Sequence, residues 1–164
     1  MSAFDAPTYG YRGAGMGGGL VTFGVIEKNE TFLGPLIALA FESAGHDCLV
    51  LRDGDHAARI LNAIRLDSIV VDIQIPGANG VDWLEAINAT WPDLPSRTLL
   101  LTHTALTSGD VLRIKRLGAE VAFRPLSIHS IKQLVVGRLR RAMSNPTGLP
   151  QMDRGQHPSV TLVN

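Results

Sequence analysis

The sequence predicts an α/β fold in which parallel strands form a single sheet with helices on both faces. Two observations support this prediction. Short runs rich in Val, Ile and Leu alternate with segments of helical periodicity, which is the pattern of repeated βα units. The central runs are continuously apolar, as buried parallel strands must be when helices cover both faces of their sheet.

Five strands are expected, each followed by a helix. The strands are Val21 to Ile26, Cys48 to Arg52, Ser68 to Asp72, Thr98 to Thr102 and Glu120 to Phe123. The helical stripes are Phe32 to Ala44, Ala57 to Ile64, Val81 to Ile87, Val111 to Leu117 and Ile128 to Leu139. Asp53 or Asp55 is expected to cap the second helix, and Gly45 and Gly118 to end the first and the fourth. Five such units fit the doubly wound, flavodoxin-like strand order 2-1-3-4-5.

The ends of the chain differ in composition from its middle. Residues 1–20 contain six glycines and almost no periodic apolar residues, so we expect a flexible, glycine-rich leader. Prolines and polar residues predominate over residues 144–164, which predicts a disordered tail. The folded domain is therefore expected over residues 21–143. The 21 residues after Met143 are fewer than the ~50 of an independent domain, so no attached DNA-binding domain is expected.

Charge and composition narrow the classes of function. The chain has 15 basic and 15 acidic side chains, so it offers no long-range attraction to nucleic acid or to an anionic membrane. It lacks a signal-peptide pattern and an apolar run of ~20 residues, so a cytoplasmic protein is expected. The single cysteine, Cys48, lies in an apolar run and is expected to be a buried, unreactive thiol.

One carboxylate stands at the predicted edge of the sheet. Asp72 ends the apolar run Ser68 to Asp72, and a loop bent by Pro76 and Gly77 follows it. Ligands of open α/β sheets bind in the crevice outside the carboxyl ends of the strands, where the strand order reverses. In the predicted order, this crevice is formed by the ends of the first, third and fourth strands. The residues that end these strands, Glu27, Lys28, Asp72 and Thr102, are therefore expected to form the site.

The stretch VVDIQIPGANG, residues 70–80, resembles the phosphoacceptor strand and loop of a response-regulator receiver domain. The resemblance covers about three quarters of the chain. It implies that Asp72 accepts a phosphoryl group, that the Thr102 hydroxyl binds a phosphoryl oxygen, and that Arg124 supplies the fixed cation. It also implies that Mg²⁺ is held by Glu27, Asp72 and the backbone carbonyl of Gln74. Thr102 taken alone equally fits a strand-end residue that binds a loop amide.

The chain departs from the receiver pattern at four positions. Lys28 stands where the second of two adjacent acids is expected, either as a solvated loop charge or as an ammonium close to the phosphoacceptor. Arg124 precedes Pro125 where the family has lysine, and the two cations are not equivalent. Val121 replaces the usual aromatic residue, and His103 replaces a small one. We therefore expect Mg²⁺ to bind weakly or not at all.

Two functions remain open, and neither makes the protein an enzyme. In the first, the chain is a stand-alone, atypical response regulator that is phosphorylated on Asp72 by a sensor histidine kinase or a histidine phosphotransfer protein. In the second, it is a pseudo-receiver that binds proteins without phosphorylation. Both imply a downstream protein partner, leave a homodimer open, and involve neither nucleic acid nor membrane. The adaptor face would carry the basic residues Arg113, Lys115, Arg116, Lys132 and Arg138.

Overall fold

A computed structural model describes residues 21–28 and 33–144 of the chain. The glycine-rich leader expected over residues 1–20 lies outside the described residues. The tail expected over residues 144–164 also lies outside them, apart from Ser144, which ends the last helix. Within the described part of the chain, no helix is long and apolar enough to cross a membrane.

The predicted five-stranded parallel sheet is confirmed. Its strands are β1 (Thr22–Ile26), β2 (Asp47–Leu51), β3 (Ser68–Asp72), β6 (Thr98–Thr102) and β7 (Glu120–Phe123). They are arranged in the order β2-β1-β3-β6-β7, with every neighbouring pair parallel. This is the predicted order 2-1-3-4-5 once the five strands of the main sheet are counted along the chain. The order in which the chain adds strands reverses between β1 and β3. The crevice at this switch point therefore lies where the sequence predicts it.

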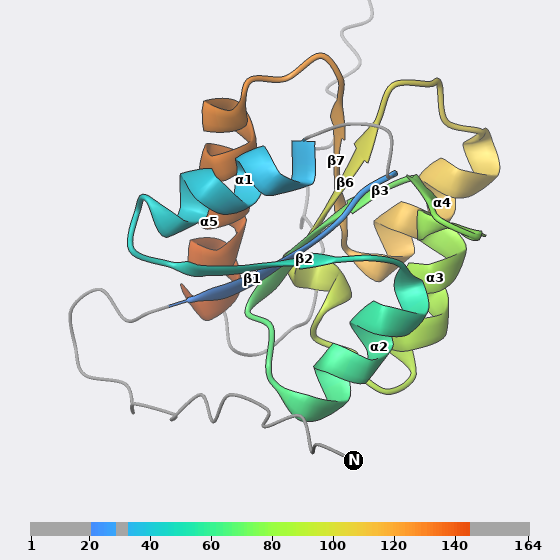
Figure 1. Ribbon diagram of the computed structural model, residues 1–164. Coiled ribbons are helices and arrows are strands. Elements are labelled where there is room, and N and C mark those ends of the chain that lie inside the picture. Colours follow the sequence, from blue (N-terminus) through green and yellow to red (C-terminus); the bar gives the residue numbers. More distant parts are fainter. Residues whose placement is uncertain (1–20, 29–32, 145–164) are drawn as a thin grey trace, which may run out of the picture.

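Helices cover both faces of the sheet. They are α1 (Leu33–Glu42), α2 (Gly54–Ala63), α3 (Gly80–Asn88), α4 (Ser108–Leu117) and α5 (Ile128–Ser144), with a short 3₁₀ helix, η1 (Pro95–Arg97), before β6. Helices α1 and α5 lie on one side of the sheet, and α2, α3 and α4 lie on the other (Figure 1). Asp53 rather than Asp55 caps α2, because its side chain accepts a hydrogen bond from the His56 amide. Gly118 ends α4 with a φ of 70°.

Two apolar clusters form the core, one on each face of the sheet. Alternate residues of β3 serve the two faces: Ile69 and Val71 pack among α2, α3 and α4, whereas Val70 packs among α1 and α5. This alternation explains why the strand is apolar throughout. Cys48 lies in the second cluster, and its burial raises the pKa of the thiol to about 12, which agrees with the expected unreactive cysteine.

A small hairpin follows Asp72, and the sequence did not predict it. Its strands are β4 (Gln74–Ile75) and β5 (Ala78–Asn79), and Gly77 turns between them with a φ of 76°. The Asn79 side chain then caps α3 by accepting a hydrogen bond from the Val81 amide at 2.7 Å. A Cβ atom on Gly80 would lie 2.4 Å from the carbonyl oxygen of Asp72. The first residue of α3, Gly80, therefore has to be glycine where the helix approaches the Asp72 backbone.

Candidate functional site

Three polar side chains meet at the carboxyl edge of the sheet. Strand pairing sets Ile26 beside Val71 and Asp72 beside Leu101, so the ends of β1, β3 and β6 lie at one edge. Glu27, Asp72 and Thr102 are 6%, 3% and 2% exposed. Acidic residues are seldom this deeply buried unless they have partners. Of the four residues predicted at these strand ends, three are thus buried there, whereas Lys28 is exposed.

Asp72 is held by two hydrogen-bond donors. An Nη atom of Arg124 donates to one carboxylate oxygen at 2.7 Å, and the Gln74 amide donates to the other at 2.9 Å. The side chains of Asp72 and Arg124 are 4% and 19% exposed, so the ion pair lies largely out of water. A charge-assisted hydrogen bond of this length is among the stronger polar contacts in a protein. Arg124, which stands where the receiver pattern has lysine, therefore binds Asp72 directly.

Backbone hydrogen bonds fix the loops that carry these groups. The Ile73 amide donates to the Leu101 carbonyl at 2.8 Å, which extends the pairing of β3 with β6 past Asp72. The Arg124 amide donates to the Thr102 carbonyl at 2.7 Å, which extends the pairing of β6 with β7. The positions of Asp72, Thr102 and Arg124 thus follow from sheet geometry.

The Thr102 hydroxyl is bonded within its own loop. It donates to the Thr104 carbonyl at 3.0 Å and lies 3.2 Å from the Thr104 amide, from which it accepts. This is the alternative arrangement considered from the sequence, a strand-end threonine that binds a loop amide. To donate to a phosphoryl oxygen, the hydroxyl would have to leave the Thr104 carbonyl.

The donor set for a divalent cation is small. Glu27 is packed against the first turn of α1, where a Cβ on Gly34 would lie 3.1 Å from Oε1 of Glu27. Among the residues described, no group of three or more acidic, histidine or cysteine side chains is arranged to hold a metal. Mg²⁺ commonly takes one or two carboxylates with several waters. The predicted ligands Glu27, Asp72 and the Gln74 carbonyl would supply few oxygens, and Arg124 already binds one oxygen of Asp72.

The other departures from the receiver pattern lie around this group. Lys28 is exposed at the end of β1, and among the described residues the cation that pairs with Asp72 is Arg124. His103 is exposed in the loop after β6. Val121 is half-buried and packs against the core cluster beneath α2, α3 and α4. An exposed aromatic side chain stands two residues later, at Phe123.

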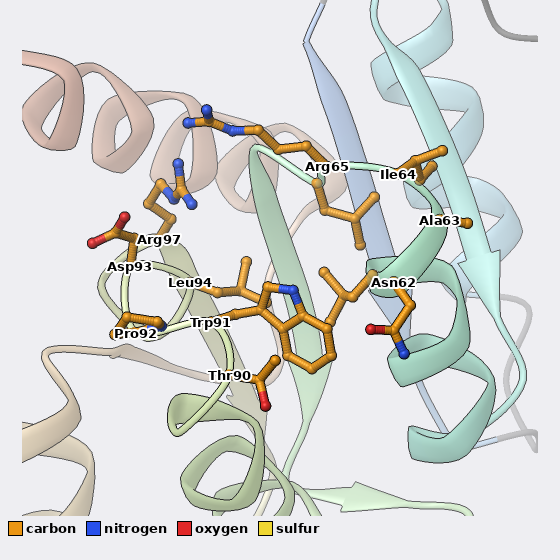
Figure 2. Close-up of a pocket in the computed structure, with 12 residues that line it drawn as sticks. Asn62, Ala63, Ile64, Arg65, Thr90, Trp91, Pro92, Asp93, Leu94 and Arg97 are labelled. Atoms are coloured by element: carbon orange, nitrogen blue, oxygen red, sulfur yellow. The ribbon is translucent and has the colours of Figure 1, made fainter.

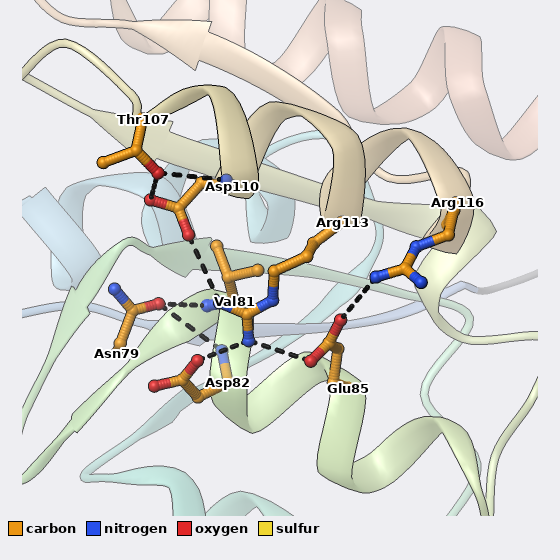
Figure 3. A network of polar contacts seen from close by, with 8 residues as sticks. All are labelled: Asn79, Val81, Asp82, Glu85, Thr107, Asp110, Arg113 and Arg116. Atoms are coloured by element: carbon orange, nitrogen blue, oxygen red, sulfur yellow. Dashed lines mark hydrogen bonds and ion pairs between the residues drawn. The ribbon is translucent and has the colours of Figure 1, made fainter.

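A network of charged side chains connects α3 with α4. Arg113 of α4 forms ion pairs with Asp82 and Glu85 of α3 and with Asp110 of its own helix, and Arg116 lies 3.7 Å from Glu85 (Figure 3). The hydrogen bond from Arg113 lowers the pKa of Glu85, and Glu85 and Asp82 together raise the pKa of Arg113. These arginines thus neutralise acids of the same chain.

The expected basic adaptor face is consequently reduced. Arg138 of α5 also pairs internally, with Glu120 at 2.9 Å. Beside α4 the surface is apolar instead, because Leu112 and Phe123 are 63% and 56% exposed. A shallow groove of about 480 Å³ lies next to them. Its lining consists of Ala105, Leu106, Val111, Ile114, Lys115, Ala119, Val121 and Phe123. The sequence signal for this groove was the apolar stripe of α4, of which Val111 and Ile114 line it.

Relatives with known roles resemble this chain over most of its length. A probable transcriptional regulatory protein of Mycobacterium tuberculosis, TcrX, is 29% identical over 131 residues, which are 80% of this chain and 53% of TcrX. The DNA-binding response regulator MtrA of Mycolicibacterium smegmatis is 24% identical over 74% of this chain and 52% of its own. The chain thus spans about half the length of these relatives. No family model matches the sequence.

Solved receiver domains share the fold. The receiver domain of the Francisella response regulator 1452 superimposes with a TM-score of 0.63 at 20% identity, covering 76% of this chain and 99% of its own. A CheY-like receiver domain protein of Methanospirillum hungatei gives a TM-score of 0.69 at 13% identity, covering 77% and 99%. The described part of the chain therefore has the receiver fold, and its sequence is similar to that of response regulators.

Proposed function

We propose that this receiver domain accepts a phosphoryl group on Asp72 from a sensor histidine kinase or a histidine phosphotransfer protein. The observation that carries the proposal is the surroundings of Asp72, a buried carboxylate at the switch point of the sheet with a guanidinium 2.7 Å away. Fixed positive charge next to a carboxylate meets the charge that develops on a transferred phosphoryl group.

The transfer would exchange one bond to phosphorus for another. A carboxylate oxygen of Asp72 attacks the phosphorus of a phosphohistidine, the P–O bond forms and the P–N bond breaks, and the released imidazole nitrogen takes up a proton. Arg124 then binds phosphoryl oxygens in place of the carboxylate oxygen that it now contacts. The Thr102 hydroxyl turns from the Thr104 carbonyl to donate to the same group. Mg²⁺, where bound, would add positive charge beside Glu27 and the Gln74 carbonyl.

The reaction is tested by incubating the protein with acetyl phosphate and weighing it intact, with and without Mg²⁺. We expect a gain of one phosphoryl group that is lost in Asp72→Asn and reduced in Thr102→Ala. Asp55→Asn, which changes an exposed aspartate in the first turn of α2, is the matched control and should be labelled as fully as the wild type. If the wild type gains no phosphoryl group from acetyl phosphate or from a phosphorylated phosphotransfer protein, the proposal is wrong.

A second function is favoured by the partners that Asp72 and Thr102 already have. Arg124 already pairs with the Asp72 carboxylate, and the Thr102 hydroxyl is bonded within its own loop. Such a domain holds one conformation without phosphate and acts as a constitutive protein-binding module. In this case Asp72→Asn leaves the affinity for the partner unchanged. A rise of about a hundredfold on phosphorylation would instead establish a two-state switch.

The output in either function is proposed to pass through protein contacts at α4 and the end of β7. The exposed side chains of Leu112 and Phe123 give this surface an apolar character, and a homodimer would use the same surface. Leu112→Asp should abolish partner binding or dimer formation. Arg59→Asp, on the exposed side of α2, should not. Equal partner binding by Leu112→Asp and Arg59→Asp would show that the interface does not include Leu112.

A further inference from the structure

A second cavity lies at the opposite edge of the sheet from Asp72. It measures about 470 Å³ and is formed by the connection between α2 and β3 and by the segment from the end of α3 to η1 (Figure 2). Arg65 precedes β3 and Arg97 precedes β6, so this cavity lies at the amino ends of strands whose carboxyl ends carry the phosphoacceptor. Its volume falls within the range of small-molecule sites.

Two guanidinium groups line this cavity from neighbouring segments. Arg65 is exposed, and the Nε atom of Arg97 is buried without a hydrogen-bond partner in the described part of the chain. A buried donor without a partner costs free energy, so Arg97 is under-satisfied in its own surroundings. Burial and then the charge of Arg65 lower the pKa of Arg97, while Asp93 and Asp67 oppose this shift. An anion between the two arginines would offset their mutual repulsion and favour the charged form of Arg97.

An aromatic ring occupies the middle of the same lining. The indole of Trp91 is half-buried and packs against the core, and Leu61, Leu66 and Leu94 line the cavity around it. Figure 2 shows the indole nitrogen at the ring edge toward the side from which the arginines extend. A flat ring held by its apolar neighbours is a stacking surface for another flat ring.

We propose that this cavity binds a small anion that carries a flat heterocycle, of the class of a nucleoside monophosphate. The phosphate would lie between the guanidinium groups of Arg65 and Arg97, and the base would lie on Trp91. Arg–phosphate pairs are favoured by the planar, multiply donating guanidinium. Asp67 accepts a hydrogen bond from the Thr22 amide at 2.9 Å and lies 3.9 Å from Arg65. These two contacts partly compensate its negative charge. Exposed Asp93 is the group that opposes the anion.

The two tryptophans allow a direct test by NMR. The indole N–H of Trp83 donates to the Gly54 carbonyl at 3.0 Å in the interior, so its ¹H–¹⁵N signal serves as an internal reference. Adding adenosine 5′-monophosphate to the ¹⁵N-labelled full chain should shift the Trp91 indole signal and leave that of Trp83 in place. We expect a dissociation constant of about 1 mM or below. Inorganic phosphate alone and adenosine alone should each bind more weakly.

Four variants test the assigned contacts. Arg65→Gln and Arg97→Gln should each weaken binding about tenfold, as expected for the loss of a charged hydrogen bond. Arg59→Gln, an exposed change outside the cavity, should leave binding unchanged. Asp93→Asn should tighten it, which a purely structural role for the cluster does not predict. The proposal is overturned if the Trp91 signal does not shift, if phosphate alone binds as tightly as the nucleotide, or if Arg59→Gln weakens binding as much as Arg65→Gln.

Discussion

The ion pair between Arg124 and Asp72 should be a major source of stability in metal-free buffer. At 2.7 Å and an effective dielectric near 20, the attraction is about 6 kcal/mol before desolvation is subtracted. Breaking a buried pair by removing one partner usually costs 3–5 kcal/mol, roughly, because a charge is left buried alone. Since Arg124 retains 19% exposure, we expect Arg124→Ala to lower the free energy of unfolding by about 3 kcal/mol.

Urea unfolding followed by circular dichroism measures this loss. Asp72→Asn and the double variant complete a thermodynamic cycle, in which the coupling energy should be at least about 2 kcal/mol. Arg59→Ala, an exposed change on α2, should stay within about 0.5 kcal/mol of the wild type. Millimolar Mg²⁺ should restore part of the stability of Arg124→Ala, because it can then reach the freed carboxylate oxygen. A coupling energy near zero would refute the reasoning.

Three further predictions follow from local contacts. Gly80→Ala should destabilise the domain by about 2 kcal/mol, because its Cβ would lie 2.4 Å from a backbone oxygen. Gly109→Ala in α4 should stabilise it, because the added Cβ would make only an ordinary contact, 3.7 Å from the Thr107 hydroxyl. Thermal melting compares the two variants. Because the Arg113 hydrogen bond lowers the pKa of Glu85, the stability from this contact is present above about pH 4.5 and is lost as pH falls through that lowered pKa. NMR titration of Arg113→Ala should find the pKa of Glu85 higher than in the wild type. Cys48 should react with a thiol reagent at pH 8 only after unfolding, and stability should fall as pH rises from 9.0 towards about 12.

Each of these predictions has a result that contradicts it. Equal melting temperatures for the two glycine variants would mean that the loop before α3 yields to the added carbon. An unchanged pKa of Glu85 in Arg113→Ala would separate the carboxyl from the network. For Cys48 the sign follows from its raised pKa, since the unfolded thiol loses its proton first and stability is complete only below pH 9.0. Alkaline loss of stability equal to that of Cys48→Ala would assign it to other groups.

The sequence predicted the sheet because its signals were local. Continuous apolar runs such as Ser68 to Asp72 mark buried parallel strands, and Gly118 marks a helix end, so strand positions and order were both recovered. The edge residues Glu27, Asp72 and Thr102 followed from topology. The ion-pair partner of each charged side chain could not be predicted in this way. That Arg113 binds Asp82 and Glu85, 31 and 28 residues away, depends on the packing of α3 against α4, which no local pattern records.

The main-chain bonds that continue β3 and β7 past their ends make the frame of this site independent of its side chains. Ile73 and Arg124 each bond through their amides to the neighbouring strand, so their positions survive a change of side chain. Charged side chains at this edge of the sheet can therefore be replaced while the backbone that carries them stays in place. Lys28→Asp combined with Arg124→Lys should install tight magnesium binding without altering the fold, and isothermal titration calorimetry would measure the gain. In a domain built in this way, a few substitutions at the strand ends change what the site binds, while the backbone architecture stays the same.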